Sequence, residues 1–350
     1  MAHRPHSPAR CGIVPPYILE ALAQHDDAVV REAAHSTLAL TAGFGASRAA
    51  TTPQPSPEGA AAPREHRSVY DARNAENLPG HLVRDEGTAA AQDVAVNEAY
   101  DGLGDTWTLY QDVYGRNSID DNGLTLIGSV HFGQRYDNAY WDGRQMVFGD
   151  GDGVLFNRFT ISVDVIGHEL THGVTGATAN LAYQGQSGAL NESVSDVFGS
   201  IVKQYTLKQT AEEADWLIGA GLLAADINGV ALRSMKAPGT AYDDPQLGGK
   251  DPQPGTMSGY VHTTGDNGGV HTNSGIPNHA FYLAAVGLGG NSWDKAGHIW
   301  YATLTGGELR TSATFSEFAA VTVSTAARLY GSAEQQAVTD AWTQVGVTLP

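Results

Sequence analysis

The sequence predicts an α+β protein in which a strand-rich region is followed by a helical region. Between residues 68 and 159, short apolar runs alternate with Gly and Asn-Gly breaks, a pattern typical of strands joined by tight turns. Beyond residue 160, apolar residues recur mostly with the 3.6-residue period of helices. With 350 residues, 41% of them hydrophobic, the chain is long enough for more than one core.

The N-terminal part differs from this body. The Pro-Pro pair at 15–16 introduces a short helix, because proline is tolerated in a first helical turn. Asp26 or Asp27 caps a second helix, which we expect to end near residue 41, before two glycines. Residues 43–68 contain four prolines among Ala, Ser, Thr and Gln, which is typical of an extended linker open to proteolysis.

In the body, strands are expected within 124–132 and 145–148. A helix is expected over 162–174. Further helices are expected near 188–206, 209–222, 275–287, 314–329 and 332–344. The chain therefore divides into an N-terminal segment (1–42), a linker (43–68), a strand-rich part ending in a helix (69–174) and a helical part (175–350).

Composition excludes several classes of protein. The net charge of −18 argues against nucleic-acid and anionic membrane partners, and a single cysteine, Cys11, excludes an internal disulfide. No apolar run is long enough to span a bilayer. The polar first ten residues do not form a secretory signal peptide. We therefore expect a monomer that is either exported by a leaderless route, which we prefer, or cytoplasmic.

Residues 168–172 read His-Glu-Leu-Thr-His between apolar flanks. A spacing of four places His168 and His172 on one helix face, where both can bind one zinc ion. Glu169 lies beside them, where it can take a proton from a zinc-activated water. A helix that holds these residues by chance is the alternative, although burying such groups without partners is expensive.

Zinc needs a third protein ligand, and Glu192 in a later helix is the candidate. Asp196 follows four residues later on the same face, where it can accept the free ring N–H of a zinc-binding histidine. Alternatively, both carboxylates are solvated. The upstream pair of histidines favours the zinc site.

Further motifs occur in a fixed order around these residues. They are Asn-Ala-Tyr-Trp (138–141), Met-Val-Phe-Gly-Asp-Gly-Asp-Gly (146–153), Leu-Arg-Ser-Met (232–235) and Asp-Asn-Gly-Gly-Val-His-Thr-Asn-Ser-Gly (266–275). Over about 69–347, the chain resembles the thermolysin-like neutral metallopeptidases. The resemblance implies a two-lobed fold with the zinc helix between the lobes, one catalytic Zn2+ and endopeptidase activity on protein or peptide substrates.

The resemblance also assigns roles to individual residues. His168, His172 and Glu192 match the zinc ligands, and Glu169 matches the catalytic glutamate. Tyr183 and His271 match the groups that stabilise the transition state, with Asp266 orienting His271. The substrate-binding residues that the resemblance implies are Asn138, Ala139 and Tyr140 on an edge strand, Arg233 for a substrate carbonyl, and Phe156, Phe159, Val165, Leu222 and Leu232 around an apolar pocket.

Each of these residues alone has an ordinary structural explanation, such as a turn former or a core aromatic, but their order and spacing favour the site. Because the pocket residues are apolar, we expect cleavage on the amino side of large hydrophobic residues. Two rival interpretations are an inactive binding module and an aminopeptidase of the His-Glu-x-x-His class. The aminopeptidase would need acidic groups to hold a free amine, and no motif for them is found.

The sequence departs from the best-known members of the family where carboxylates bind a pair of calcium ions. Asp164 and Asp215 match that cluster, but Lys203 stands where a glutamate is expected. Leu217 and Ala220 replace two further ligands. An ammonium both removes oxygen donors and repels cations. We therefore expect Lys203 to pair with Asp164 and Asp215 in place of the calcium pair. The alternative is a solvated lysine at a helix end. Val230 likewise replaces a ligand aspartate of another calcium site.

Residues 11–18 (Cys-Gly-Ile-Val-Pro-Pro-Tyr-Ile) resemble the short propeptides of protealysin-like members of the family. The resemblance implies a zymogen inhibited by its own propeptide. A tethered segment has a high effective concentration at the cleft, so even weak docking can block it. The Cys11 thiolate could also take the open zinc position. Alternatively, Cys11 is an ordinary small packing residue.

Overall fold

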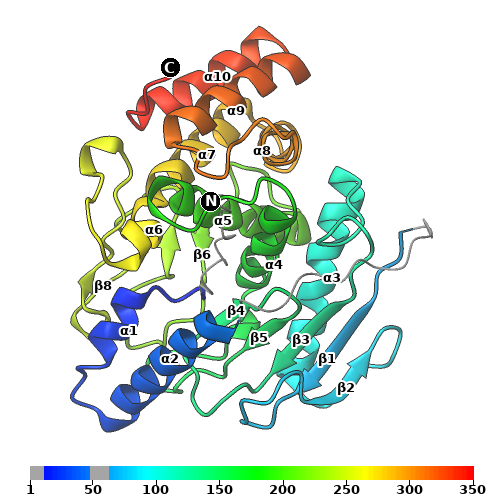
Figure 1. Ribbon diagram of the computed structural model, residues 1–350, viewed down its shortest axis with the longest axis vertical. Helices are drawn as coiled ribbons and strands as arrows, with labels where there is room; N and C mark the ends of the chain where they lie inside the picture. Colours follow the sequence, from blue (N-terminus) through cyan, green and yellow to red (C-terminus); the bar gives the residue numbers. More distant parts are fainter. Residues whose placement is uncertain (1–11, 48–62) are drawn as a thin grey trace, which may run out of the picture.

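The computed structural model describes residues 12–47 and 63–350 (Figure 1). The predictions for Cys11 and for most of the linker lie outside the described residues. Two helices come first, α1 (Pro16–Leu22) and α2 (Ala28–Ser47). The Asp27 carboxylate accepts the Val29 N–H at 2.7 Å, so Asp27 provides the expected cap.

The strand-rich part is built on one five-stranded mixed sheet with the order β2-β1-β3-β5-β4. The strands are β1 (Arg67–Asp71), β2 (His81–Asp85), β3 (Leu126–Val130), β4 (Ala139–Trp141) and β5 (Met146–Phe148). β1, β3 and β5 run parallel, whereas β2 and β4 pair antiparallel at the two edges. The long helix α3 (Val94–Tyr114) packs on β1 and β3. One edge of the sheet is therefore β4.

The helical part follows, and its last four helices cover the end of the molecule away from the sheet (Figure 1). The helices are α4 (Val163–Ala177), α5 (Gly185–Leu207), α6 (Asp266–Asn273), α7 (Gly275–Leu288), α8 (Lys295–Thr305), α9 (Phe315–Leu329) and α10 (Ser332–Gln344). The short strands β6 (Leu217–Ile218) and β7 (Arg233–Ser234) pair, as do β8 (Asp243–Asp244) and β9 (Gly249–Lys250). This arrangement confirms the α+β prediction, with α4 between the two parts.

Three expectations about single elements were wrong or incomplete. The second helix passes Gly43 and Gly45 and ends at Ser47, because glycine weakens a helix by only about 1 kcal/mol and does not have to end it. Residues 209–222 do not form a helix: the backbone turns through positive φ at Trp216, and β6 follows. α3 lies within the region read as strands and turns.

α4 and α5 approach each other very closely. A Cβ added at Gly199 of α5 would lie 2.3 Å from the backbone oxygen of Asp164 in α4, so no larger residue fits. Gly167 of α4 faces Gly199, where an added Cβ would lie 3.1 Å from the Gly199 Cα. These two contacts bring the side chains of both helices within reach of one another.

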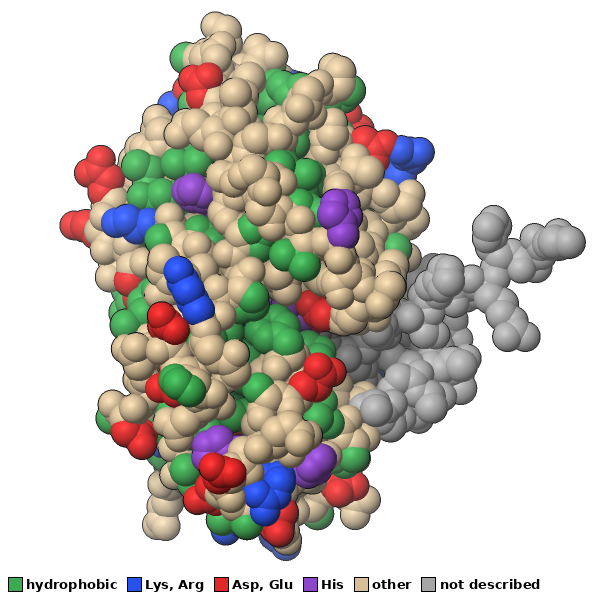
Figure 2. Space-filling model, turned by 90° about the vertical axis from the view of Figure 1, so that its left-hand side faces the viewer, with side chains coloured by type: hydrophobic (Ala, Val, Ile, Leu, Met, Phe, Trp, Pro, Cys, Tyr) green, Lys and Arg blue, Asp and Glu red, His purple; other side chains and the backbone are tan. Residues whose placement is uncertain are grey.

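The N-terminal segment belongs to the main core rather than lying apart from it. Ile13, Ile18, Leu22 and Val30 are fully buried in the same hydrophobic cluster as the residues of α4 and α5. On the face shown in Figure 2, the Lys and Arg side chains are few and lie among Asp and Glu, unlike the clustered cations of nucleic-acid binding surfaces. None of the helices within 12–47 and 63–350 is long and apolar enough to cross a membrane.

Candidate active site

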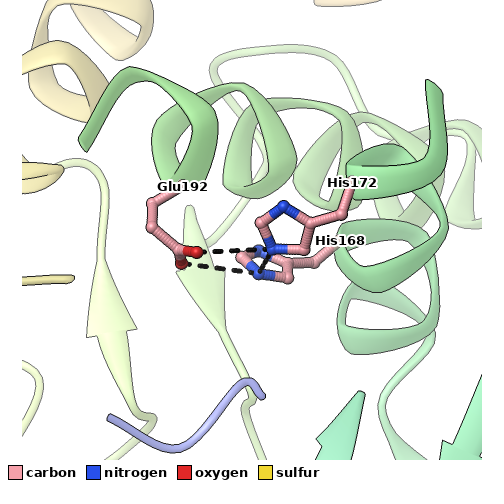
Figure 3. A group of neighbouring side chains, drawn as sticks. All are labelled: His168, His172 and Glu192. Atoms are coloured by element: carbon pink, nitrogen blue, oxygen red, sulfur yellow. Dashed lines mark hydrogen bonds and ion pairs between the residues drawn. The ribbon is translucent and has the colours of Figure 1, made fainter. Parts of the chain in front are cut away.

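His168 and His172 of α4 face Glu192 of α5 (Figure 3). The His172 Nε2 lies 3.3 Å from one Glu192 oxygen, and the His168 Nε2 lies 3.6 Å from the other. The two Nε2 atoms are 3.1 Å apart. One ligand atom from each residue thus lies within 4.8 Å of the others, a spacing at which one metal ion can contact all three.

The chemistry of these donors fits zinc. His168 Nδ1 contacts Asp196 at 2.8 Å and His172 Nδ1 contacts Asn191 at 2.8 Å, which leaves both Nε2 atoms for a metal. Burial lowers the pKa of each histidine to about 4, so both rings are neutral, as ligands must be. One buried oxygen of Glu192 has no hydrogen-bond partner among the described residues. Two imidazoles and a carboxylate are a typical donor set for catalytic zinc.

Glu169 is fully buried beside the two histidines. The Trp141 N–H of β4 donates to one carboxylate oxygen at 2.9 Å, whereas the other oxygen has no hydrogen-bond partner in the described chain. Burial raises the pKa of Glu169 well above its usual range, although the Trp141 hydrogen bond opposes this shift. Glu169 is therefore a stronger base than an ordinary glutamate, with one oxygen available to a proton.

Tyr183, His271 and Asp266 meet on another side of the cluster. The Tyr183 hydroxyl donates to Glu192 and lies 3.5 Å from His271 Nε2. His271 Nδ1 lies 2.6 Å from Asp266, which also accepts the His271 backbone N–H at 2.9 Å. Residues 267–269 all have positive φ, and glycine at 268 and 269 allows this turn. The turn brings the Asp266 carboxylate back onto the His271 ring.

Arg233 of β7 forms a two-point ion pair with the buried Asp196 of α5. Its Nε and Nη2 donate to the two Asp196 oxygens at 2.9 and 2.8 Å. Burial raises the pKa of Asp196, but the Arg233 charge and the His168 hydrogen bond outweigh it, so this pKa lies well below its usual range. Asp196 therefore carries a negative charge that holds both His168 and Arg233.

The N-terminal segment lies along the β4 edge and contacts the residues expected to bind substrate. The Ile13 N–H donates to the Ala139 carbonyl at 3.1 Å, and Arg233 Nη1 donates to the Ile13 carbonyl at 3.0 Å. The Asn138 side chain accepts the Val14 N–H at 2.9 Å and donates to the Val14 carbonyl at 3.3 Å. All four backbone N–H and C=O groups of Ile13 and Val14 are thus paired, and the pair with Ala139 joins two backbones as when a peptide strand is added to a sheet edge.

Comparisons with known proteins agree with this geometry. The catalytic domain of thermolysin metallopeptidases matches residues 58–176, and the alpha-helical domain of the same family matches 179–347. An extracellular metalloprotease of Pectobacterium carotovorum subsp. carotovorum is 53% identical over 338 residues, 96% of each chain. The chain belongs to the thermolysin metallopeptidase family.

Two further relatives of this metallopeptidase are similar over most of its length. Protease PrtS of Photorhabdus sp. (strain Az29) is 56% identical over 284 residues, which are 81% of this chain and 76% of PrtS. The solved structure of the precursor of protealysin, a metalloproteinase from Serratia proteamaculans, superposes with a TM-score of 0.89 at 54% identity. It covers 97% of this chain and 100% of its own, so the likeness includes the N-terminal segment.

The predicted pocket residues of this metallopeptidase are all buried and belong to the cluster that contains Ile13: Phe156, Phe159, Val165, Leu222 and Leu232. The rings of Phe156 and Phe159 lie 5.7 Å apart. The Tyr140 side chain instead packs in a second cluster, at 6.1 Å from the Phe132 ring and 6.0 Å from the Tyr136 ring.

Lys203 of α5 lies between the two expected aspartates. Its Nζ donates to Asp164 at 2.9 Å and to the Leu217 carbonyl at 2.8 Å, and it lies 2.8 Å from Asp215. Burial lowers the pKa of Lys203, but the carboxylates outweigh it and raise the pKa above its usual value. The ammonium is therefore charged, and Asp164 of α4 is neutralised by the chain itself.

Sequence reasoning missed two residues that support the zinc ligands. Asn191 contacts His172 Nδ1 at 2.8 Å, and Ser195 lies 3.1 Å from the same atom. Both follow from the helical register of α5: Ser195 is three residues after Glu192, and Asn191 directly precedes it. The hydrogen bond from Trp141 to Glu169 comes from a backbone N–H, so the type of residue at position 141 could not have predicted it.

Proposed function

We propose that the chain is the precursor of a zinc-dependent endopeptidase that cleaves on the amino side of large hydrophobic residues. The observation that carries this proposal is the His168, His172 and Glu192 cluster with the Glu169 carboxylate anchored to the β4 edge. Family membership supports the zinc and the peptidase activity. The apolar, buried pocket residues support the preference for a large hydrophobic side chain.

The three ligands would hold zinc, which lowers the pKa of a water toward ~7 and polarises the substrate carbonyl. Glu169 accepts the proton of the attacking water on its free oxygen while the Trp141 N–H fixes the other. The same carboxyl group then passes this proton to the leaving amine. Because the pKa of Glu169 is raised by burial, the carboxyl can hold the proton between these two steps.

Tyr183 and His271 stabilise the charge that develops on the substrate carbonyl oxygen. Both present a polar atom to the same side of the cluster, the Tyr183 hydroxyl and the His271 Nε2, 3.5 Å apart. Asp266 fixes the His271 ring by its 2.6 Å contact with Nδ1, so that Nε2 is directed to the substrate. Losing one such donor typically raises the barrier by about 3 to 4 kcal/mol.

The decisive test uses internally quenched peptides blocked at both ends. The activated enzyme should cleave a peptide with Leu or Phe after the scissile bond, and a zinc chelator should abolish the cleavage. Glu169→Gln should retain zinc but lose about 10²- to 10⁴-fold in kcat. An aminopeptidase would leave blocked peptides intact, and a binding module would cleave nothing. A preference for Lys or Asp after the bond would contradict the pocket assignment.

The N-terminal segment is proposed to be an inhibitory propeptide, followed by a linker that contains the activating cut. The contacts of Ile13 and Val14 with Asn138, Ala139 and Arg233 support this, since substrate would need the same groups. Similarity to a precursor structure along the whole chain supports it further. Full-length protein that is as active as linker-cleaved protein would contradict the proposal.

We also propose how the propeptide is aligned relative to a substrate in the active site. Ile13, whose carbonyl is held by Arg233, takes the place of the residue that follows the scissile bond. The Cys11 contact with zinc stays a prediction outside the described residues. It is tested by Cys11→Ser in a Glu169→Ala background, where zinc spectra that do not change would contradict it.

We propose that the enzyme acts outside the cell, because a relative of similar length is named an extracellular metalloprotease. The monomeric state stays a prediction. The export route, and the expected lack of nucleic-acid and membrane partners, stay predictions. Fractionation of the producing cells tests the location: enzyme confined to the cytoplasm would contradict it. Sedimentation tests the oligomeric state.

We also propose that Lys203 replaces the calcium pair found in other members of the family. Its contacts with Asp164, Asp215 and the Leu217 carbonyl occupy oxygens that a cation would need. The unfolding temperature should therefore be the same with calcium and with a calcium chelator. A calcium-dependent shift that Lys203→Met leaves unchanged would indicate another site, and two calcium ions bound at Asp164 would refute the replacement.

A further inference from the structure

The carboxylate of Asp196 receives four hydrogen bonds. His168 Nδ1 and Arg233 Nη2 contact one oxygen, each at 2.8 Å. Arg233 Nε at 2.9 Å and the Asn278 side-chain amide at 2.8 Å donate to the other. A carboxylate has about four acceptor sites, so this fully buried group is saturated.

Asn278 is the donor to which the family resemblance assigned no role. It lies on α7 and is fully buried, and its amide oxygen has no hydrogen-bond partner among the described residues. An unpaired buried oxygen lowers stability, so packing alone would favour an apolar side chain of similar volume. The opposite amide orientation would set this oxygen against the Asp196 carboxylate and repel it. A role in holding Asp196 therefore explains the amide at position 278 better than packing in the hydrophobic core does.

We propose that Asn278 is a positioning residue that, through Asp196, holds the zinc ligand His168 and the substrate clamp Arg233 in place together. Without its N–H, one Asp196 oxygen keeps only the Arg233 Nε, and the carboxylate can turn about its own bond. Such a turn moves the Asp196 oxygen that contacts His168 Nδ1. It also moves the Arg233 guanidinium, which is held by both Asp196 oxygens and whose Nη1 donates to the Ile13 carbonyl. Metal retention and binding of the substrate carbonyl should then weaken together.

This inference rests on the proposed zinc peptidase function. Asn278→Leu keeps the number and branching of the side-chain heavy atoms and removes the donor, and Asn278→Ala removes both the donor and the bulk. Asn97→Ala, on α3, is the control. The Asn97 amide oxygen accepts the Ala91 N–H at 2.9 Å, and the Asn97 amide nitrogen donates to the Ala91 carbonyl at 2.8 Å. Each variant is made as the full chain. Zinc affinity is measured on that chain by competition with a chelator, and KM, kcat and thermal unfolding are measured after linker cleavage.

Both Asn278 variants should bind zinc about threefold to tenfold more weakly, since they disturb the partner of a ligand rather than the ligand itself. At saturating zinc, KM for a blocked peptide should rise by a similar factor while kcat changes less. Asn278→Leu should unfold nearer to the wild-type temperature than Asn278→Ala, which also leaves a cavity, whereas Asn97→Ala should lower only the unfolding temperature.

The inference is overturned if the Asn278 variants lose thermal stability but keep zinc affinity and KM within twofold of wild type. It is also overturned if only one of these two properties changes. Failure of the proposed function would look different, because the wild-type zinc-loaded enzyme itself would then not cleave the peptide.

Discussion

Lys203 is a single side chain that determines how the chain neutralises the buried Asp164 at the start of α4. The ammonium makes two contacts with carboxylates and one with a backbone carbonyl, and its side chain is only 10% exposed. A tethered cation of this kind cannot dissociate or be removed by a chelator. The family resemblance led to the prediction of this ion pair, because Lys203 stands where the resemblance leads one to expect a calcium-binding glutamate.

Replacement of Lys203 by Met should lower the free energy of unfolding by about 3–5 kcal/mol, because Asp164 would remain buried without a counter-charge. Lys295→Met is the control, since its pair with Glu334 is exposed and contributes little. Chemical denaturation of both variants near pH 7 measures the difference. Equal effects at the two positions would contradict a buried ion pair.

Residue types and spacing predicted the zinc ligands as well as Glu169 and Asp196, because each needs a particular chemistry at a particular helical register, whereas His271 and Arg233 were predicted only through the family resemblance. Residue types and spacing could not predict Asn278 or Trp141. Asn278 lies 82 residues from Asp196, and only the tertiary fold brings them together. Trp141 acts through its backbone, which is common to every residue except proline.

Among the elements, the pair of α4 and α5 determines whether the site forms at all. The ligands are divided between these helices, and the contact at Gly199 sets the distance between the helix axes. A metal site tolerates ligand displacements of only a few tenths of an ångström. The distance between α4 and α5 should therefore affect how tightly this enzyme binds its metal ion.

Gly199→Ala should destabilise the protein by about 1–3 kcal/mol and weaken zinc binding, because the new methyl group would meet the Asp164 backbone oxygen. Gly176→Ala is the matched control on α4, where an added Cβ meets nothing within 4 Å. That variant should be slightly more stable than wild type, because alanine favours a helix. Zinc titration and thermal unfolding are the measurements, and unchanged zinc affinity in Gly199→Ala would contradict the argument.

His131, at the end of β3, links two elements of the strand-rich part. Its Nε2 lies 2.9 Å from Asp93, which caps α3, and its Nδ1 lies 2.8 Å from Asp150, which follows β5. The hydrogen bond with Asp150 is the largest cause that raises the pKa of His131, to about 9, with burial opposing it. The ring is therefore charged at neutral pH.

His131→Asn should lower the free energy of unfolding by about 1–2 kcal/mol near pH 6.5, a value reduced because the carboxylates are partly exposed. Folding raises the pKa of His131 from 6.5, so the contribution is complete below pH 6.5 and is lost as the pH rises through about 9. Denaturation across pH 6 to 10 should show the variant approaching wild type at high pH. His81→Asn on the exposed edge strand is the control, and a difference that does not change with pH would contradict the assignment.

The elements were predictable where the periodic pattern was strong, as in α4, α9 and α10. α3 was missed because Gly102 and Gly104 interrupt its apolar stripe. At Gly102 α3 lies close to α4, and a larger residue would require the tip of the Ile166 side chain, 2.3 Å from an added Cβ, to shift. The helix expected at 209–222 failed for the opposite reason, because an apolar composition with a suitable period was overruled by turns at Trp216, Gly219 and Gly221.

At the scale of the whole molecule, the N-terminal segment completes the hydrophobic core and covers the substrate edge in one continuous interface. Ile13, Ile18 and Leu22 have no exposed surface and pack in the main hydrophobic cluster with residues of α4 and α5. Cutting the linker therefore leaves these contacts in place. Release of the segment should be a separate and slower step than cleavage.

Ile13→Ala should raise the peptidase activity of the uncleaved chain about thirtyfold or more, up to that of the cleaved enzyme, because losing a fully buried isoleucine costs about 2–5 kcal/mol and favours the open state. Glu20→Ala, at an exposed position of α1, is the control and should leave the activity of the uncleaved chain unchanged. Initial rates on a blocked peptide are read while gels show an intact linker. Equal rates for Ile13→Ala and wild type would mean that Ile13 does not hold the segment closed.

The hydrogen bond from the Trp141 N–H to Glu169 also couples the positions of the two parts of the molecule. It crosses the junction between the two parts of the molecule, joining the sheet edge to α4. Ala139, two residues earlier on the same strand, holds the backbone of whatever lies in the cleft. Any relative movement of the two parts would therefore displace the proton acceptor and the bound segment in the same direction. This hydrogen bond would thus keep the distance between the Glu169 carboxylate and a peptide on β4 constant, which the alignment at the cleaved bond requires.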